Sequence, residues 1–280
     1  MTATEPPADF GAGTRGAESV ASADDSDLSP SRAADSAGMP WAGRTLPGNG
    51  FGGDDGLADT ALVAALEGRA AHPCAEHDRG LATAAACARW IVPIVAAPTE
   101  LAEGGHGLAE EKSTDMAVVT LTSPDGRRAL PVFTSVAALA GWDATARPVP
   151  VDALRAAQSA VAEGCDVLVV DLGSLRPTEI RPSMVWALAQ GHEWLPPHED
   201  PFVARAVDRA VADEVDVLAH RVEEGDPEGA GVLRVVLVLE EGLDEGSVHG
   251  TATRVGERLA TDGELRARVD GLTFTIEGAA

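Results

Sequence analysis

Strand-length apolar runs alternate with capped helical segments along most of this chain of 280 residues. The clearest run, Cys165–Asp171, contains Val-Leu-Val-Val and has the length and β-branched composition of a buried strand. Before it, Asp152 is placed to cap a helix that extends to about Glu163. A short strand and a helix are predicted after it, over Thr178–Ile180 and Pro182–Gln190. The alternation predicts an α+β fold, with helices packed on a mixed sheet and a smaller α+β domain behind it.

The strongest turn signal is the Pro-Asp-Gly sequence within Ser123–Gly126. It separates the apolar runs Met116–Thr122 and Arg128–Phe133, and this arrangement predicts a β-hairpin. Further upstream, Trp90–Ala96 is an apolar run of strand length. Its internal Pro93 has no N–H to donate, so we expect it at the edge of a sheet or at a bulge.

Capping residues predict the other elements of this part of the chain. Asp59 is placed to open a helix that carries Leu62, Val63 and Leu66 on one face, and Gly68 is placed to end it. The remaining predictions are a helix over Ala75–Arg89, a helix over Val136–Trp142 capped by Thr134 or Ser135, and an extended segment over Arg147–Val151.

Composition divides the chain into four parts. Residues 1–41 are rich in Ala, Ser, Asp, Gly and Pro without a periodic apolar pattern, which predicts a disordered acidic tail. We expect one domain over 42–191, a linker over 192–200 and a smaller α+β domain over 201–280. The predicted elements of the smaller domain are helices over Phe202–Val211 and Asp244–Ala260, and strands over Val215–Arg221, Val232–Leu239 and Leu272–Ile276.

Charge and hydropathy exclude several classes of partner. The chain has 45 acidic against 21 basic residues, a formal net charge of −24, and no local basic tract, so binding to nucleic acid is not expected. No apolar run approaches the roughly 18 residues of a membrane helix, and Met1–Phe10 lacks a signal-peptide pattern. Three cysteines are too few for a disulfide framework, which favours a cytoplasmic location.

Metal and catalytic motifs are weak. His72, Cys74, His77 and Cys87 are metal-ligand types, but their spacing is not that of a zinc site, and two histidines five residues apart would splay on a helix. The glycine-dense segment Gly48–Gly56 does not follow a strand, and Gly-x-Ser-x-Gly is absent. We therefore predict no catalytic residues, no metal and no cofactor.

Lys112 is the only lysine of the chain, and Asp115 follows it three residues later. A buried Lys112 would be a nucleophile or an anion anchor, whereas an exposed one would form an ordinary surface ion pair. Together with Arg128 at the adjacent hairpin, Lys112 and Asp115 are the predicted ligand-binding or partner-binding residues.

The five tryptophans divide by context. Trp90, Trp142 and Trp186 have apolar neighbours and are predicted to lie in the core. Trp41 and Trp194 lie in loop or linker sequence, where packing over a domain edge is favoured over anchoring a partner. The acidic C-terminal half is interpreted as a solvated face, with a docking surface for a basic partner as the second interpretation.

Six segments occur in a characteristic order along the chain: Arg44–Asn49, Phe51–Gly56, Trp90–Val95, Glu111–Met116, Arg128–Val136 and Ala187–Gly191. Together they resemble the SseB family, the enhanced-serine-sensitivity proteins, in the form found in actinobacteria. The likeness covers roughly residues 42–191 and continues more faintly over 200–280. It implies an α+β domain in a cytoplasmic protein and brings no catalytic residues. A link to sulfurtransferase activity has been suggested for distant members, but Cys74, Cys87 and Cys165 lack the anion-cradling loop that a persulfide would need.

The functional hypothesis is a non-enzymatic binding or regulatory module for an unknown protein or small metabolite. The alternative is an enzyme that uses Lys112 as nucleophile or anion-holding group. A third possibility is that residues 1–40 recruit a partner while the domains act as a scaffold.

Overall fold

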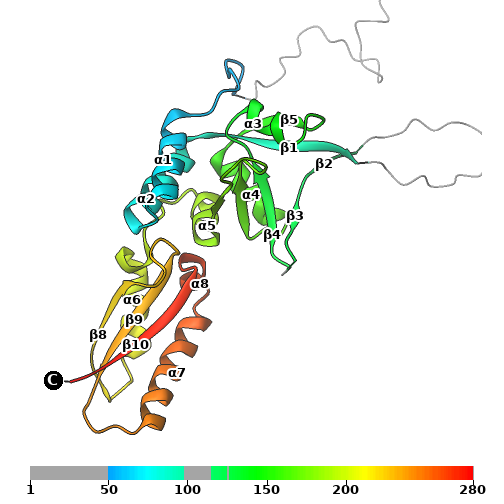
Figure 1. The fold of residues 1–280 in the computed structure, drawn as a ribbon. Coiled ribbons are helices and arrows are strands. Elements are labelled where there is room, and N and C mark those ends of the chain that lie inside the picture. The colour runs from blue at the N-terminus through cyan, green and yellow to red at the C-terminus, as the bar shows by residue number, and fades with distance from the viewer. Residues whose placement is uncertain (1–49, 98–114, 125, 280) are drawn as a thin grey trace, which may run out of the picture. The chain divides into compact units, whose positions relative to one another are not determined.

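The computed structural model describes residues 50–97, 115–124 and 126–279 (Figure 1). The chain divides into compact units at residues 1–52 and 53–280, and every element named below belongs to the second unit. Residues 60–190 form α1 (Thr60–Ala71), α2 (Ala75–Cys87), β1 (Arg89–Ala97), β2 (Asp115–Val118), β3 (Leu121–Thr122), β4 (Arg128–Val132), α3 (Val136–Trp142), β5 (Arg147–Asp152), α4 (Ala153–Ala162), β6 (Val167–Val170), β7 (Thr178–Ile180) and α5 (Pro182–Gln190). Residues 197–278 form η2 (Pro197–Glu199), α6 (Pro201–Val211), β8 (Val217–Glu224), β9 (Val232–Leu239), α7 (Glu245–Thr261), α8 (Gly263–Arg268) and β10 (Gly271–Gly278). The predicted α+β fold is confirmed.

Two sheets organise residues 89–180. The first is antiparallel with the order β2-β1-β5, and the second has the order β3-β4-β6-β7, in which β4 and β6 run parallel. Ile91 and Phe133 exchange backbone hydrogen bonds of 2.9 and 2.8 Å, and this bridge joins the two sheets. The predicted hairpin is confirmed, because β3 and β4 pair antiparallel across a turn in which Gly126 has a φ of 87°. The predicted strand Met116–Thr122, however, is split between the two sheets as β2 and β3.

Pro93 does not lie at a sheet edge, because β1 is the central strand of its sheet. Ile91 directs its N–H and C=O toward Phe133, away from β5, so Pro93, two residues further along, directs its nitrogen to the same side. On that side β1 pairs with Phe133 at Ile91 and with β2 only from Ile94 onward. Pro93 therefore lies between two partners, where no N–H is required, and the edge prediction was wrong.

Small side chains let helices approach the sheets closely. Four alanines of α4 are buried, and the helix contacts β1, β4 and β6 as well as α5. The core they complete contains Trp90, which is fully buried and donates its ring N–H to the Ala85 carbonyl at 3.0 Å. Asp59, Ser135 and Asp152 cap α1, α3 and α4 with side-chain oxygens as predicted. Gly68 does not end α1, which continues to Ala71.

Residues 201–278 have their own core. The sheet has the order β10-β9-β8 (Figure 1). Alternate residues of β9, from Leu233 to Leu239, belong to one core together with residues of α6, α7 and α8. The helix α8 was not predicted from the sequence. It has six residues, four of them charged or glycine, and only Leu265 is buried, so it carries too little apolar pattern to be recognised.

Glu214 connects the turn before β8 to α7. Its buried carboxylate accepts hydrogen bonds from Arg254 and lies 2.8 Å from the Arg258 guanidinium. The hydrogen bond from Arg254 is the main reason why the pKa of Glu214 lies below its ordinary value, and the bond from Arg258 adds to the effect. The pair therefore stabilises the fold only while the carboxylate is ionised.

We expect Glu214→Gln to lower the free energy of unfolding at pH 7 by about 1–3 kcal/mol, the usual contribution of hydrogen bonds to a charged group. Because the pKa is lower in the folded state, this difference should be complete above the ordinary pKa of about 4.3 and shrink as the pH falls below it. Urea unfolding between pH 7 and pH 3 measures the difference. Glu257→Gln, an exposed acid on α7, is the control and should shift stability little at any pH. A Glu214 difference that persists at pH 3 would contradict the argument.

Candidate functional site

The predicted site residues are only partly covered by the structure. Lys112 lies outside the described residues. Asp115 begins β2, where its backbone pairs with Ala97. Arg128 begins β4 and is half-buried; its N–H donates to Asp166 at 3.2 Å, and its guanidinium to Thr120 at 3.4 Å. Arg128 thus makes contacts within the fold, and the grouping of the three residues into one site stays a prediction.

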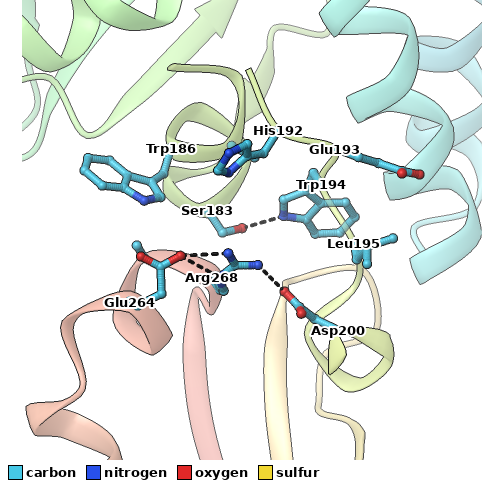
Figure 2. A pocket seen from close by; sticks show the side chains of 11 residues that line it. Ser183, Trp186, His192, Glu193, Trp194, Leu195, Asp200, Glu264 and Arg268 are labelled. Carbon is cyan, nitrogen blue, oxygen red and sulfur yellow. Dashed lines mark hydrogen bonds and ion pairs between the residues drawn. The ribbon is translucent and has the colours of Figure 1, made fainter. Parts of the chain in front are cut away.

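A cleft between α5 and α8 carries a denser set of polar and aromatic side chains. We call it the α5–α8 cleft, and Figure 2 shows its lining. The lining side chains are Ser183, Trp186 and Ala187 of α5, His192, Glu193, Trp194 and Leu195 of the following segment, Asp200, and Glu264, Ala267 and Arg268 of α8.

The turn after α5 determines where Trp194 lies. Gly191 ends α5 in the left-handed conformation with a φ of 66°, which a side chain would disfavour. The chain then leads to Trp194, whose ring N–H donates to Ser183 Oγ at 3.0 Å. Ser183 in turn donates its hydroxyl to Asp270 at 2.7 Å. These contacts fix Trp194 in the wall of the cleft, with 6% of its surface exposed. The segment 192–200, predicted as a linker, is thus packed at this point.

Arg268 lies between two carboxylates across the cleft. Its guanidinium donates to Asp200 at 2.8 Å and to Glu264 at 2.9 and 2.7 Å (Figure 2). Burial acts to lower the pKa of Arg268, but the hydrogen bonds to Asp200 and Glu264 outweigh it and raise the pKa. Arg268 therefore stays charged, and its charge is already neutralised by its two partners.

Trp186 is the exposed aromatic group of the cleft. The prediction that it lies in the core was wrong, because 37% of its surface is exposed. The sequence around Trp186 is apolar because α5 buries the neighbouring Met184 and Val185. Trp186 itself lies on the outer side of the helix. Figure 2 places its indole at one end of the cleft, on the same side as Glu264. Trp142 is half-buried and Trp90 is buried, whereas Trp41 lies outside the described residues.

The cleft carries net negative charge. Glu193, Asp200 and Glu264 contribute three carboxylates, against the single guanidinium of Arg268. Its electrostatics therefore favour a cationic group, and the exposed indole of Trp186 is a surface over which such a group binds well.

A buried ion network lies next to the cleft and shares Ser183 with it. Arg181, only 7% exposed, donates to Asp78 at 2.8 Å, to Asp270 at 2.9 Å and to the Gly229 carbonyl at 2.7 Å. Asp78 is 1% exposed and also accepts from Arg69 at 2.7 Å. The network joins α1, α2 and α5 to the loops before β9 and β10, and its charges are used internally.

Other chemistry in the described part of the chain is limited. No group of three or more His, Cys, Asp or Glu side chains there is placed to hold a metal ion. Cys165 is buried, and burial raises the pKa of its thiol. Among the described helices, none combines the length and the apolar composition needed to cross a bilayer.

The fold and the cleft together define a class of α+β protein. It has two sheets over residues 89–180, a third sheet with its own core over residues 201–278, and an acidic cleft with a tryptophan in its wall. Residues 62–187 match the family model of the SseB protein N-terminal domain, and this part of the chain is therefore assigned to that domain family. The resemblance seen in the sequence is thereby confirmed over these residues, whereas the fainter likeness over 200–280 stays a prediction. No curated protein and no solved structure matches the chain.

Proposed function

We propose that this protein is a non-enzymatic binding module, and that a positively charged side chain of a partner protein binds over the exposed Trp186 indole at the edge of its α5–α8 cleft. The observation that carries the proposal is the exposed Trp186 indole in a cleft of net negative charge. An arginine or lysine over an indole gains roughly 0.5–1 kcal/mol at exposed sites and about 2 when it is desolvated. This makes the second interpretation of the acidic surface, a docking surface for a basic partner, the favoured one.

The charge of the whole chain supports a cationic partner. A net charge of −24 raises the rate at which a basic segment approaches, because long-range attraction steers it toward the surface. Orientation then depends on the cleft: Asp200 and Glu264 already neutralise Arg268, so the exposed Glu193 and the Trp186 indole are the groups left to attract a cation. The cleft thereby supplies the selectivity that a uniformly acidic surface lacks.

The polar groups of the cleft favour binding over catalysis. Asp200 and Glu264 are held by Arg268, whose raised pKa keeps it from exchanging protons near neutral pH. The enzyme alternative rests on Lys112, and the hypothesis of recruitment by the tail rests on residues 1–40. Both groups of residues lie outside the described part of the chain, so both hypotheses stay predictions.

Binding of a short acetylated peptide with two arginines between glycines tests the proposal. Titration calorimetry on the full chain should show binding of this peptide and none of its glutamate counterpart. Trp186→Leu and, separately, Glu193→Gln should weaken binding roughly three- to thirtyfold, the range expected for losing a cation–π contact or a neighbouring charge. Glu257→Gln removes the same charge from exposed α7, outside the cleft, and should leave the affinity nearly unchanged.

Two results would overturn the proposal. One is equal binding by the wild-type chain and Trp186→Leu, which would mean that the acidic surface attracts the peptide without the cleft. The other is the absence of binding at millimolar peptide in low salt.

A further inference from the structure

A cysteine and a histidine are paired outside the cleft, at the start of α2. Cys74 is the N-cap residue of this helix, and its Sγ lies 3.0 Å from Nδ1 of His77, one turn further on. Both residues are half-buried, so neither is sealed inside the core. Neither residue contributes to the α5–α8 cleft.

The His77 ring is held in place by α1 as well as by α2. A Cβ atom at Gly68 would lie 3.1 Å from Cδ2 of His77, so glycine in the middle of α1 makes room for the imidazole. The ring of His72 stacks on the ring of His77, with a centroid distance of 6.2 Å and an interplanar angle of 23°. The two histidines do not share a helix, since His72 follows the end of α1 and only His77 lies on α2, so the splaying expected on one helix does not arise.

We propose that Cys74 is a nucleophilic thiol and a site of modification by small soft electrophiles and by peroxides, with His77 as its proton acceptor. In the tautomer that carries its proton on Nε2, Nδ1 of His77 accepts the thiol hydrogen. The N-terminus of a helix favours the negative sulfur that forms.

The chemical step is balanced with either reagent. With an alkyl iodide, the proton passes from Sγ to Nδ1, the sulfur forms a bond to carbon, and iodide leaves. With hydrogen peroxide, the thiolate attacks one oxygen, the O–O bond breaks, and sulfenic acid and water form after hydroxide takes a proton. The sulfur is oxidised and the peroxide is reduced.

The chain contains its own reference thiols. Cys87 is exposed and is the last residue of α2, at the opposite end of the helix from the Cys74–His77 pair. Cys165 is buried, and burial raises the pKa of its thiol. The helix α2 therefore has Cys74 beside an imidazole at its start and the exposed Cys87 at its end. The buried Cys165 becomes reactive only if the fold opens, so it reports on unfolding.

Alkylation of the full chain by iodoacetamide at pH 7, followed by peptide mass spectrometry of each cysteine, tests the inference. Cys74 should react roughly tenfold faster than Cys87 despite being less exposed, and Cys165 should stay protected. With dilute hydrogen peroxide, a dimedone-type trap should label Cys74 before Cys87. A Cys74 rate at or below that of Cys87 would overturn the proposal.

Two variants test the role of His77. His77→Gln should reduce the Cys74 rate to about that of Cys87, while the rates of Cys87 and Cys165 stay unchanged. Gly68→Ala favours α1 through helix propensity but pushes on the imidazole, so it should slow Cys74 without exposing Cys165. A fast Cys74 in both variants would show that His77 is not the proton acceptor. If Cys165 becomes reactive in His77→Gln, that variant has partly unfolded, and the Cys74 rate in Gly68→Ala then tests the role of His77.

Discussion

Arg181→Ala is expected to lower the free energy of unfolding by about 3–5 kcal/mol, the usual cost of removing one partner from a buried ion network. The side chains of Asp78 and Asp270 are 1% and 7% exposed, and both lose the Arg181 guanidinium in this variant. Asp78 keeps Arg69, whereas the buried Gly229 carbonyl loses its shorter hydrogen bond and keeps only the 3.2 Å bond from Arg69. The loss should be large because the carboxylates stay buried without full compensation.

Urea unfolding of the full chain at pH 7, followed by circular dichroism, measures this loss. Arg221→Ala is the control: Arg221 also pairs with two acids, Glu223 and Glu277, but all three side chains are well exposed on the C-terminal sheet. It should change stability little, since water and salt screen exposed pairs. Equal effects of the two substitutions would contradict the view that burial, and not the number of ion pairs, determines the cost.

Trp90→Ala should lower the free energy of unfolding by a similar amount, about 3–5 kcal/mol, because it opens a large cavity in the first core. Trp90 is fully buried between α2 and the sheets, and its ring N–H satisfies the Ala85 carbonyl near the end of α2. Trp90→Phe retains much of the apolar volume but leaves that carbonyl without this donor, so a loss of about 1–3 kcal/mol is expected.

Thermal and urea unfolding of both variants separate the two contributions. Trp186→Phe is the control at an exposed tryptophan on α5 and should leave stability almost unchanged. If Trp90→Phe were as damaging as Trp90→Ala, the hydrogen bond to Ala85 would outweigh the packing of the ring, contrary to the expected order.

Hydrogen bonds through one residue, Ser183, connect the cleft to the buried ion network. Ser183 accepts from Trp194 and donates to Asp270, and Asp270 also accepts from Arg181. The second residue of α5 is thus the link between the wall of the cleft and the buried charges. A binding cleft on this support is preorganised, since its aromatic wall is held by hydrogen bonds before a partner arrives.

The elements predicted best from the sequence are those with strong local signals. The helices α3 and α5 and the strands β7 and β9 have the predicted bounds, and Asp59, Ser135, Asp152 and Asp244 cap helices with their own side chains. These signals are local because a cap or an apolar period involves residues within a few positions of one another.

The predictions that failed concern contacts between distant segments. Pro93 was assigned to an edge or a bulge because a proline cannot donate, but β1 is a central strand whose partners change at this position. Gly68 was assigned to a helix end, yet its role is clearance for the His77 ring. Trp186 was assigned to the core on its apolar neighbours, and the side of α5 on which it lies is exposed.

The sequence by itself determined the α+β class, most element positions, the caps and the SseB-type character of residues 62–187. Only the tertiary structure decided which of the many acidic and basic residues meet: Arg181 with Asp78 and Asp270, Arg268 with Asp200 and Glu264, and Cys74 with His77. The physical reason is distance. Electrostatic and hydrogen-bonding partners act over a few ångströms, and the packing of the sheets and helices, not the order of residues along the chain, brings these groups within that range.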